Sequence, residues 1–262
     1  MPSFYAHYRF GASVLDTLPE PLRSVCTDHR ALFDIGLHGP DIFSFFRPYY
    51  PNPVSRSADE SHKLTGKEFF ERFLSVYGNY KDKEALLSYF CGFLCHLALD
   101  SVCHPEVYRA ERYTGQSHLA IETSFDCAML IQNGINPVSH DPCGHFQINK
   151  AVISAVAAVF STISEKDVKK SLRGTMFYSR FLFIRNHAVR KLIYTAFRLM
   201  NHRHSVHDLV MTPQPNPHCA ESDTALSTCF ETAKDIAYEL LTQTHLYIEN
   251  KIPIGPVFDR SF

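Results

Sequence analysis

The segment "FCGFLCHLALDSVCHPEVY", Phe90 to Tyr108, constrains the fold most, because it sets polar side chains at regular steps in an otherwise apolar run. His96, Asp100 and His104 follow one another at intervals of four residues. On an α-helix with about 3.6 residues per turn, such side chains lie on one slowly drifting stripe. Burying that stripe without partners would cost free energy. The segment therefore predicts a helix whose polar stripe meets polar groups from other parts of the chain.

Helical periodicity dominates the rest of the chain, and no segment alternates polar and apolar residues with hairpin turn signals. The sequence predicts an all-α fold in one compact domain of 262 residues. A long, polar, Pro-punctuated loop is expected between about residues 47 and 68. The predicted helices cover about residues 9–18, 20–36, 66–78, 83–104, 117–132, 147–162, 166–202 with a break, and 221–249.

Composition narrows the class of protein. A formal net charge of −1 argues against a protein that coats nucleic acid or anionic membranes through bulk charge. The eight cysteines form no CxxC pair, so reduced thiols are expected. The start "MPSFYAHYRF" shows no signal peptide, and the apolar runs "ALLSYFCGFLC" and "AVISAVAAVF" are too short to span a bilayer. We therefore expect a cytoplasmic protein without a transmembrane segment; its oligomeric state is not predicted.

A second pair of polar residues turns the stripe into a candidate metal site. His118 and Glu122 lie four residues apart on the next predicted helix, after an expected break of about a dozen residues that begins at Pro105. Imidazole nitrogen and carboxylate oxygen suit zinc, and catalytic zinc usually takes three protein ligands. A single histidine is more often packed or hydrogen-bonded than metal-bound, but five matched positions favour a metal. His104, His118 and Glu122 form one candidate set, and His96 with Asp100 needs companions, for which the N-terminal third offers His7, His38, Asp41 and His62.

Five elements in a fixed order carry a family resemblance: "HYRFG", "GPD", a histidine in the following loop, "HLALDSVCH" and "HLAIE". Their order resembles the zinc-dependent phospholipase C superfamily, whose relatives include the fungal single-strand nucleases. The HxxxDxxxH spacing is most similar to the catalytic domain of glycosylphosphatidylinositol-specific phospholipase D. The resemblance covers about residues 4–126 and implies one domain over residues 1–262, in which helices within 147–250 complete the bundle.

The resemblance also implies ligands and a catalytic residue. Asp41 matches the carboxylate proposed as general base in the family, where it orients a metal-bound water. Secreted relatives complete the second zinc site with their processed N-terminal residue, whereas His7 here follows an initiator segment. Two or three zinc ions are therefore expected, and His38 is an alternative ligand. The implied ligands are Asp41, His62, His96 and Asp100 for a first zinc, Asp100 and His7 for a second, and His104, His118 and Glu122 for a third.

This ligand set predicts a phosphodiester hydrolase. Metals bind phosphate oxygens, lower the pKa of a bound water to about 7 and stabilise the leaving oxygen. A phospholipid substrate is implied by the resemblance alone, so a nucleotide or another organic phosphate ester stays open. The alternative is a non-catalytic helical module that binds metal structurally or recruits a partner.

Two further segments have competing interpretations. The basic segment that ends in "RKLIYTAFRLMNHRHSVH" and includes residues 185–207 suits either phosphate and lipid contact or the solvated face of a core helix, and the second interpretation is favoured. Its histidines His202, His204 and His207 are left out of the site. The segment "SHDPCGH", residues 139–145, carries a His-Asp dipeptide typical of another all-α phosphohydrolase class, but a polar turn explains it adequately.

Overall fold

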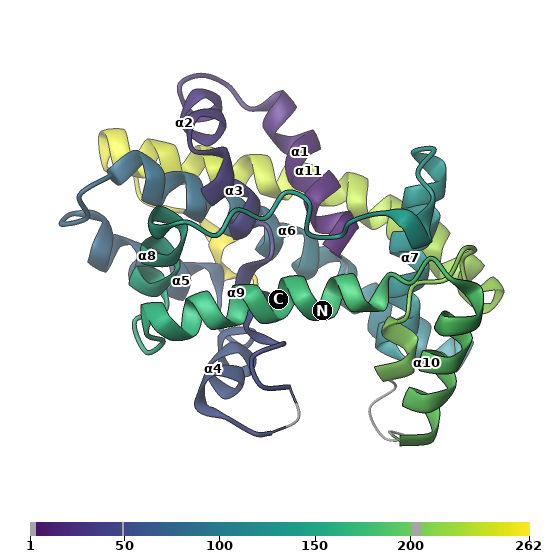
Figure 1. Cartoon of the computed structure of the whole chain (residues 1–262). Coiled ribbons are helices and arrows are strands. Elements are labelled where there is room, and N and C mark those ends of the chain that lie inside the picture. Colours follow the sequence, from purple (N-terminus) through teal and green to yellow (C-terminus); the bar gives the residue numbers. More distant parts are fainter. Residues whose placement is uncertain (1–3, 49, 201–205) are drawn as a thin grey trace. The chain divides into compact units, whose positions relative to one another are not determined.

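The computed structural model describes residues 4–48, 50–200 and 206–262. Over these ranges the chain forms helices and no β-strand, with one isolated bridge between Thr65 and Ser261, so the all-α prediction is confirmed (Figure 1). The α-helices are α1 (Phe4–Thr17), α2 (Leu22–Asp28), α3 (Arg30–Gly36), α4 (Pro53–Ser61), α5 (Gly66–Tyr77), α6 (Lys83–Thr114), α7 (His118–Gln132), α8 (Lys150–Val159), α9 (Glu165–Leu182), α10 (His187–Met200) and α11 (Ala220–Asn250). The 3-10 helices are η1 (Gly39–Phe43), η2 (Pro137–Ser139), η3 (Val206–Leu209), η4 (Pro217–Cys219) and η5 (Pro256–Asp259).

Contacts along the chain divide it into two compact units, each built from separate segments. The larger unit consists of His7–Val102, His145–Thr175 and Glu231–Phe262. The smaller unit consists of Met1–Ala6, Cys103–Gly144 and Met176–Phe230. The two units are described separately, and a single domain over residues 1–262 stays a prediction.

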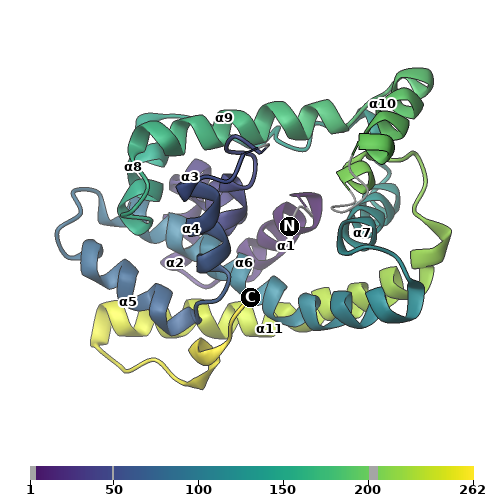
Figure 2. The same ribbon diagram turned by 90° about the horizontal axis from the view of Figure 1, so that it is seen from below.

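The core of the larger unit is aromatic. The Phe73 and Phe90 rings stack with centroids 4.2 Å apart, and those of Phe69 and Phe93 lie 4.3 Å apart. All four side chains are buried, and burial of one such ring contributes about 1.5–3 kcal/mol. Around this core α3 contacts α8, and α5 contacts both α8 and η5 (Figure 2).

Two glycines allow α3 and α6 to touch backbone to backbone within the larger unit. A Cβ on Gly36 would overlap the carbonyl oxygen of Tyr89, and a Cβ on Gly92 would overlap the carbonyl oxygen of Phe33. Any side chain at either position would push the two helices apart. This close crossing fixes the height of α6 relative to the turn that follows α3, which carries Asp41.

The smaller unit is organised around α7. This helix contacts η2, η3 and η4, and η3 in turn contacts α10. The carboxylate of Asp126 on α7 is buried and accepts hydrogen bonds from the backbone N–H groups of Tyr5 and Ala6, at 3.0 and 2.9 Å. It thereby satisfies two N–H groups of the first turn of α1, which have no partner inside the helix.

The expected helix break at Pro105 is wrong, because α6 continues through this proline to Thr114. Pro105 is exposed, so water can reach the carbonyl group that the missing N–H leaves without a helical partner. Cys103, Val107 and Ala110 continue the buried face at helical spacing. Tertiary packing of this face therefore overrides the local cost of proline, and only residues 115–117 separate α6 from α7.

The loop expected between residues 47 and 68 contains a helix, α4. The Asn52 side chain caps it by accepting a hydrogen bond from the Ser55 backbone N–H at 2.9 Å, and Pro53 occupies the first helical position. Both are helix-start signals. The polar composition of the segment favoured a loop over a helix in the sequence, because α4 buries only Val54, Ala58 and Ser61.

By length and composition, the described residues include one helix that could cross a membrane, α6. In its most apolar window, 89% of the residues are buried inside the protein. A buried core helix passes the same test, so this feature is weak evidence for a membrane span.

Candidate metal centre

The larger unit gathers five of the predicted ligands from four elements. His96 and Asp100 come from α6 and His7 from α1. His7 Nε2 lies 3.2 Å from Asp100 Oδ1, and His96 Nε2 lies 3.3 Å from Asp100 Oδ2. The Nδ1 atoms of His7 and His96 are 3.2 Å apart. All three side chains are buried, so the polar stripe of the sequence does meet partners from distant segments.

Asp41 and His62 complete this cluster. Asp41 is buried in η1, and His62 caps the C-terminus of α4, with its Nε2 3.0 Å from Asp41 Oδ1. The other ring nitrogen, Nδ1, lies 3.0 Å from the carbonyl oxygen of Ala58 and must donate to it. Burial lowers the pKa of His62, but the hydrogen bond and charge of Asp41 raise it on balance, which favours a protonated ring that donates Nε2–H to Asp41. In the neutral ring Nε2 instead turns its lone pair toward the carboxylate, and the two acceptors that then face each other would be stabilised by a cation between them.

The donor atoms form two triads, His7/His96/Asp100 and Asp41/His62/His96, in each of which they lie within 4.8 Å of one another. Zinc–nitrogen bonds of about 2.0–2.1 Å in a tetrahedron place neighbouring ligand atoms about 3.4 Å apart. The measured separations of 3.2 and 3.3 Å around Asp100 are close to that spacing. His96 is fully buried, and among the described residues its Nε2 makes no hydrogen bond, because the Asp100 oxygen 3.3 Å away is not aligned for one. The residues therefore fit zinc, and His96 rather than Asp100 joins the two triads.

Gly39 holds the turn that presents Asp41. Its φ is +45°, a backbone conformation that glycine adopts without strain. A Cβ at this position would overlap the imidazole ring of His96. The "GPD" motif thus needs glycine for two independent reasons, and both act on the cluster.

His145, which the sequence assigned to a polar turn, lies beside His38 in the structure. Its Nε2 lies 2.7 Å from Nε2 of the buried His38, and the Tyr8 ring stacks on it with centroids 4.3 Å apart. Burial lowers the pKa of His38 well below its usual value, so both rings can be neutral, with one nitrogen donating and the other accepting. The His38 carbonyl oxygen accepts from the Asp41 backbone N–H at 3.0 Å. His38 belongs to neither triad and instead supports the turn that carries Asp41.

The smaller unit brings together the other predicted set. His118 Nε2 lies 3.2 Å from Glu122 Oε1, and His104 Nε2 lies 3.8 Å from the same oxygen. The three donor atoms lie within 4.8 Å of one another. His104 and Glu122 are buried, whereas the His118 side chain is 23% exposed. Gly115, with φ of +68°, lies in the short turn that returns α7 beside α6.

Burial and neighbouring charges shift the pKa values of these histidines and carboxylates in opposite directions. Burial lowers the pKa of His96 to about 3, although Asp100 acts in the opposite direction. Burial would raise the pKa of Asp41, but the hydrogen bond and charge of His62 help to hold it below its usual value. Burial lowers the pKa of His118, yet the hydrogen bond to Glu122 raises it on balance. A neutral imidazole and an ionised carboxylate, as at His96 and Asp41, are the forms that bind metal.

The segment "SHDPCGH" does not add ligands in the manner of a His-Asp site. Asp141 forms a two-pronged salt bridge with Arg180, with Nη2 to Oδ2 at 2.7 Å and Nε to Oδ1 at 2.9 Å. His140 contacts the Tyr5 ring edge-on at 5.2 Å. The interpretation as a polar turn agrees with this geometry.

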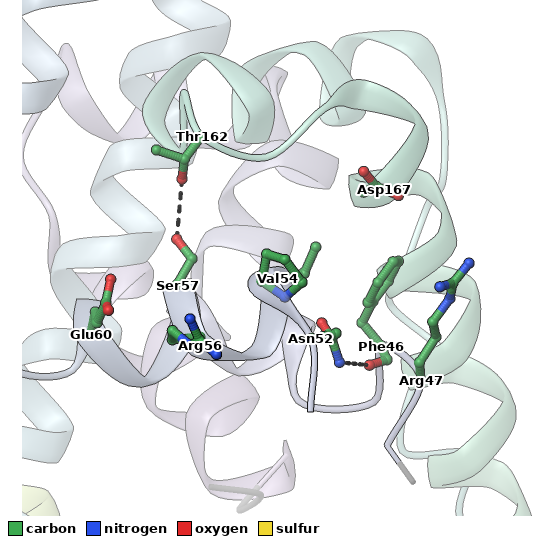
Figure 3. Close-up of a pocket in the computed structure, with 10 residues that line it drawn as sticks. Phe46, Arg47, Asn52, Val54, Arg56, Ser57, Glu60, Thr162 and Asp167 are labelled. Carbon is green, nitrogen blue, oxygen red and sulfur yellow. Dashed lines mark hydrogen bonds between the residues drawn. The ribbon is translucent and has the colours of Figure 1, made fainter. Parts of the chain in front are cut away.

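The larger unit also has a cavity of about 440 Å³ beside the N-terminus of α4 (Figure 3). The Ser57 and Thr162 hydroxyls are 3.1 Å apart at its wall, and Asn52 donates to the carbonyl oxygen of Phe46 at 2.9 Å. The lining includes Arg47 and Arg56 as well as Glu60 and Asp167, so both signs of charge are present. The described residues that line it include none of the candidate ligands, and we keep it apart from the metal centre.

Comparison with known proteins agrees with the geometry. The family model described as zinc dependent phospholipase C matches residues 6–168, more than half of the chain. That range contains all eight candidate ligands. Searches of curated proteins and of solved structures returned no match. On its sequence, its helices and its clustered histidines and carboxylates, the chain belongs to the zinc-dependent phospholipase C family.

Proposed function

We propose that this protein is a zinc-dependent hydrolase that cleaves the phosphodiester bond of a phospholipid on the glycerol side. The observation that carries the proposal is the pair of triads joined by His96, a fully buried residue whose Nε2 makes no hydrogen bond among the described residues. Family membership supports a lipid substrate. The products of such a reaction are diacylglycerol and a phosphorylated headgroup.

In the larger unit, His7, His96, Asp100, Asp41 and His62 would hold zinc, and His104, His118 and Glu122 would hold a further ion in the smaller unit. Bound zinc supplies positive charge that draws in phosphate oxygens and lowers the pKa of a coordinated water. The Ala58 carbonyl fixes the His62 ring so that Nε2 faces the cluster. Such fixed donors lower the reorganisation needed for binding.

We assign Asp41 as the catalytic carboxylate. Its side chain is 3% exposed, and its lowered pKa keeps it ionised at neutral pH. An ionised carboxylate accepts a hydrogen bond from an attacking water and aligns its lone pair toward phosphorus. The oxygen of that water forms the new bond to phosphorus, the bond to the glycerol oxygen breaks, and the proton that the water loses ends on the departing oxygen.

The test combines turnover with metal analysis. Protein purified without chelators should contain at least one zinc per chain and should hydrolyse p-nitrophenyl phosphocholine and phosphatidylcholine. Chelation should abolish both activities, and zinc should restore them. If zinc is bound but no lipid, nucleotide or simple ester is turned over, the protein is a non-catalytic metal-binding module and the proposal fails.

A further inference from the structure

The smaller unit exposes an apolar surface on α10 and the end of α9. Leu192 and Leu199 on α10 are 69% and 70% exposed, and Phe177 on α9 is 65% exposed. Phe181 and Val189 extend the surface and are also exposed. Exposed large apolar side chains are ordinary singly, but a cluster of them marks an interaction surface. The sequence-based preference for the solvated face of a core helix does not account for these exposures.

The apolar residues of α10 divide into two faces. Val189, Leu192, Ala196 and Leu199 recur at spacings of three and four residues and form one stripe. A different face packs inward, where Tyr194 meets His207 with ring centroids 5.2 Å apart and Phe197 meets Phe181 at 6.5 Å. The inward face already provides the packing that holds α10, so the exposed stripe is not needed for the core.

Cations flank this stripe without acidic neighbours. Residues 176–200 contain five basic side chains and no Asp or Glu, in a chain whose formal net charge is −1. Arg180 pairs with Asp141, and Arg190 is buried and donates to the Ile184 carbonyl oxygen at 2.7 Å. The remaining three, Arg185, Lys191 and Arg198, are exposed and form no salt bridge within the described part of the chain. Residues 201–205, which include His202, Arg203 and His204, lie outside the described residues.

We propose that the apolar stripe of α10 docks on an anionic lipid surface. Apolar side chains entering the headgroup boundary, with cations beside them at the level of lipid phosphates, characterise interfacial amphipathic helices. Charge selects this partner over a second copy of the chain. In a symmetric dimer through this face, the exposed cations of one copy would meet those of the other and repel them.

Vesicle sedimentation tests the inference without any need for turnover. The probes are phosphatidylcholine vesicles with and without about 30% phosphatidylglycerol. Wild-type protein should bind the anionic vesicles at least about 10-fold more tightly than the neutral ones, and added salt should weaken this binding. The double variant Leu192→Ser/Leu199→Ser should lose about 10-fold or more, and Lys191→Gln/Arg198→Gln should lose the preference for anionic lipid.

The matched control is Tyr238→Ser/Ile252→Ser, which removes two apolar side chains of 44% and 48% exposure outside the α10 surface. It should bind vesicles as the wild type does. Equal loss in the control and the α10 variant, or unchanged binding in the α10 variant, overturns the inference. So does a wild-type dimer in light scattering that becomes a monomer in the Leu192→Ser/Leu199→Ser variant.

This inference deepens the proposed function, yet the two fail separately. All variants should retain wild-type hydrolysis of p-nitrophenyl phosphocholine, because none of them touches the metal centre. Vesicle binding with no hydrolysis of any ester would leave the docking surface standing and overturn the proposed function. Hydrolysis of the soluble ester with no vesicle binding would leave the proposed function standing and overturn the docking surface.

Discussion

The two ligand clusters differ in how the chain builds them. The cluster of the larger unit draws on α1, η1, α4 and α6, and its contacts join residues as far apart in the sequence as His7 and His96. The cluster of the smaller unit uses only α6 and α7, and His104 lies 18 residues from Glu122. Each cluster has one partly exposed histidine, His62 with 27% and His118 with 23% of its side chain accessible, so exposure alone does not separate the two clusters.

This difference separates two ways of making a metal site. The larger cluster depends on the packed core, because helices meeting at Gly36 and Gly92 and the turn at Gly39 set its geometry. The smaller cluster depends on two neighbouring helices and one short turn. We expect the larger cluster to hold its ion tightly and to lose zinc and activity together when one ligand is removed. We expect the smaller cluster to exchange its ion more readily and to lose only part of the activity when one ligand is removed.

The largest expected effect follows from removal of the residue that both triads of the larger unit share. His96→Ala should lose at least one zinc per chain and reduce turnover by at least about 100-fold. Removing a metal ligand should lower metal affinity and activity more than removing a residue that only supports a ligand. Plasma emission spectrometry and p-nitrophenyl phosphocholine hydrolysis measure the two quantities. His245→Ala, on α11 of the same unit, is the matched histidine control and should keep both near wild type. Retention of full zinc and activity in His96→Ala would remove the basis of the proposed function.

The sequence predicted the parts of these clusters that depend on local spacing. Steps of four residues identified His96, Asp100 and His104, and likewise His118 and Glu122. The grouping of His7, Asp41 and His62 with them came from family resemblance, since no spacing connects segments that meet only through the fold. His145 was assigned to a polar turn and not to this region for the same reason, because its partner His38 is 107 residues away.

Helix boundaries show the same limit. The helical class and most helix positions were predicted from periodicity, and the structure confirms the class. Pro105 was misread because the buried face of Cys103, Val107 and Ala110 outweighs a local rule. The α4 helix was missed because its polar composition concealed the Asn52–Pro53 start.

The next largest effect tests whether backbone packing shapes the buried cluster. Gly39→Ala should reduce turnover by about 10- to 100-fold, because a methyl group overlapping His96 displaces a ligand. Gly115→Ala is the control for backbone strain. Its φ is also positive, at +68°, but a Cβ there meets nothing within 4 Å. Both variants pay a backbone strain of about 1–2 kcal/mol. Thermal unfolding should show the larger destabilisation in Gly39→Ala, because overlap with the buried His96 ring adds to the backbone strain, and turnover and zinc content should fall mainly in that variant. Equal losses of activity would attribute the effect to strain alone.

A smaller effect is expected at the cluster of the smaller unit. His118→Ala should lose about one zinc and reduce turnover by about 10-fold, because His118 belongs to one triad only and water can replace this partly exposed ligand while His104 and Glu122 remain. The zinc bound in the larger unit should stay. During timed chelation the fast phase of zinc release, which we assign to the cluster of the smaller unit, should be the one that disappears. If His118→Ala instead matches His96→Ala in zinc and activity, the two clusters behave as one and the contrast between them is wrong.

The smallest effect concerns a residue that binds no metal in either cluster. Asp126→Asn keeps the shape of the side chain but replaces one acceptor oxygen with an NH₂ group, which faces a backbone N–H of Tyr5 or Ala6. The buried donor left without a partner should lower the free energy of unfolding by about 1–2 kcal/mol in urea titration. The exposed cap variant Asp82→Asn should cost less, because its amide oxygen can still accept from the Ala85 N–H. On α1, His7 follows Ala6 directly, so the Asp126 contacts lie next to a candidate ligand. A turnover change larger than about threefold in Asp126→Asn would therefore mean that the start of α1 helps to position His7.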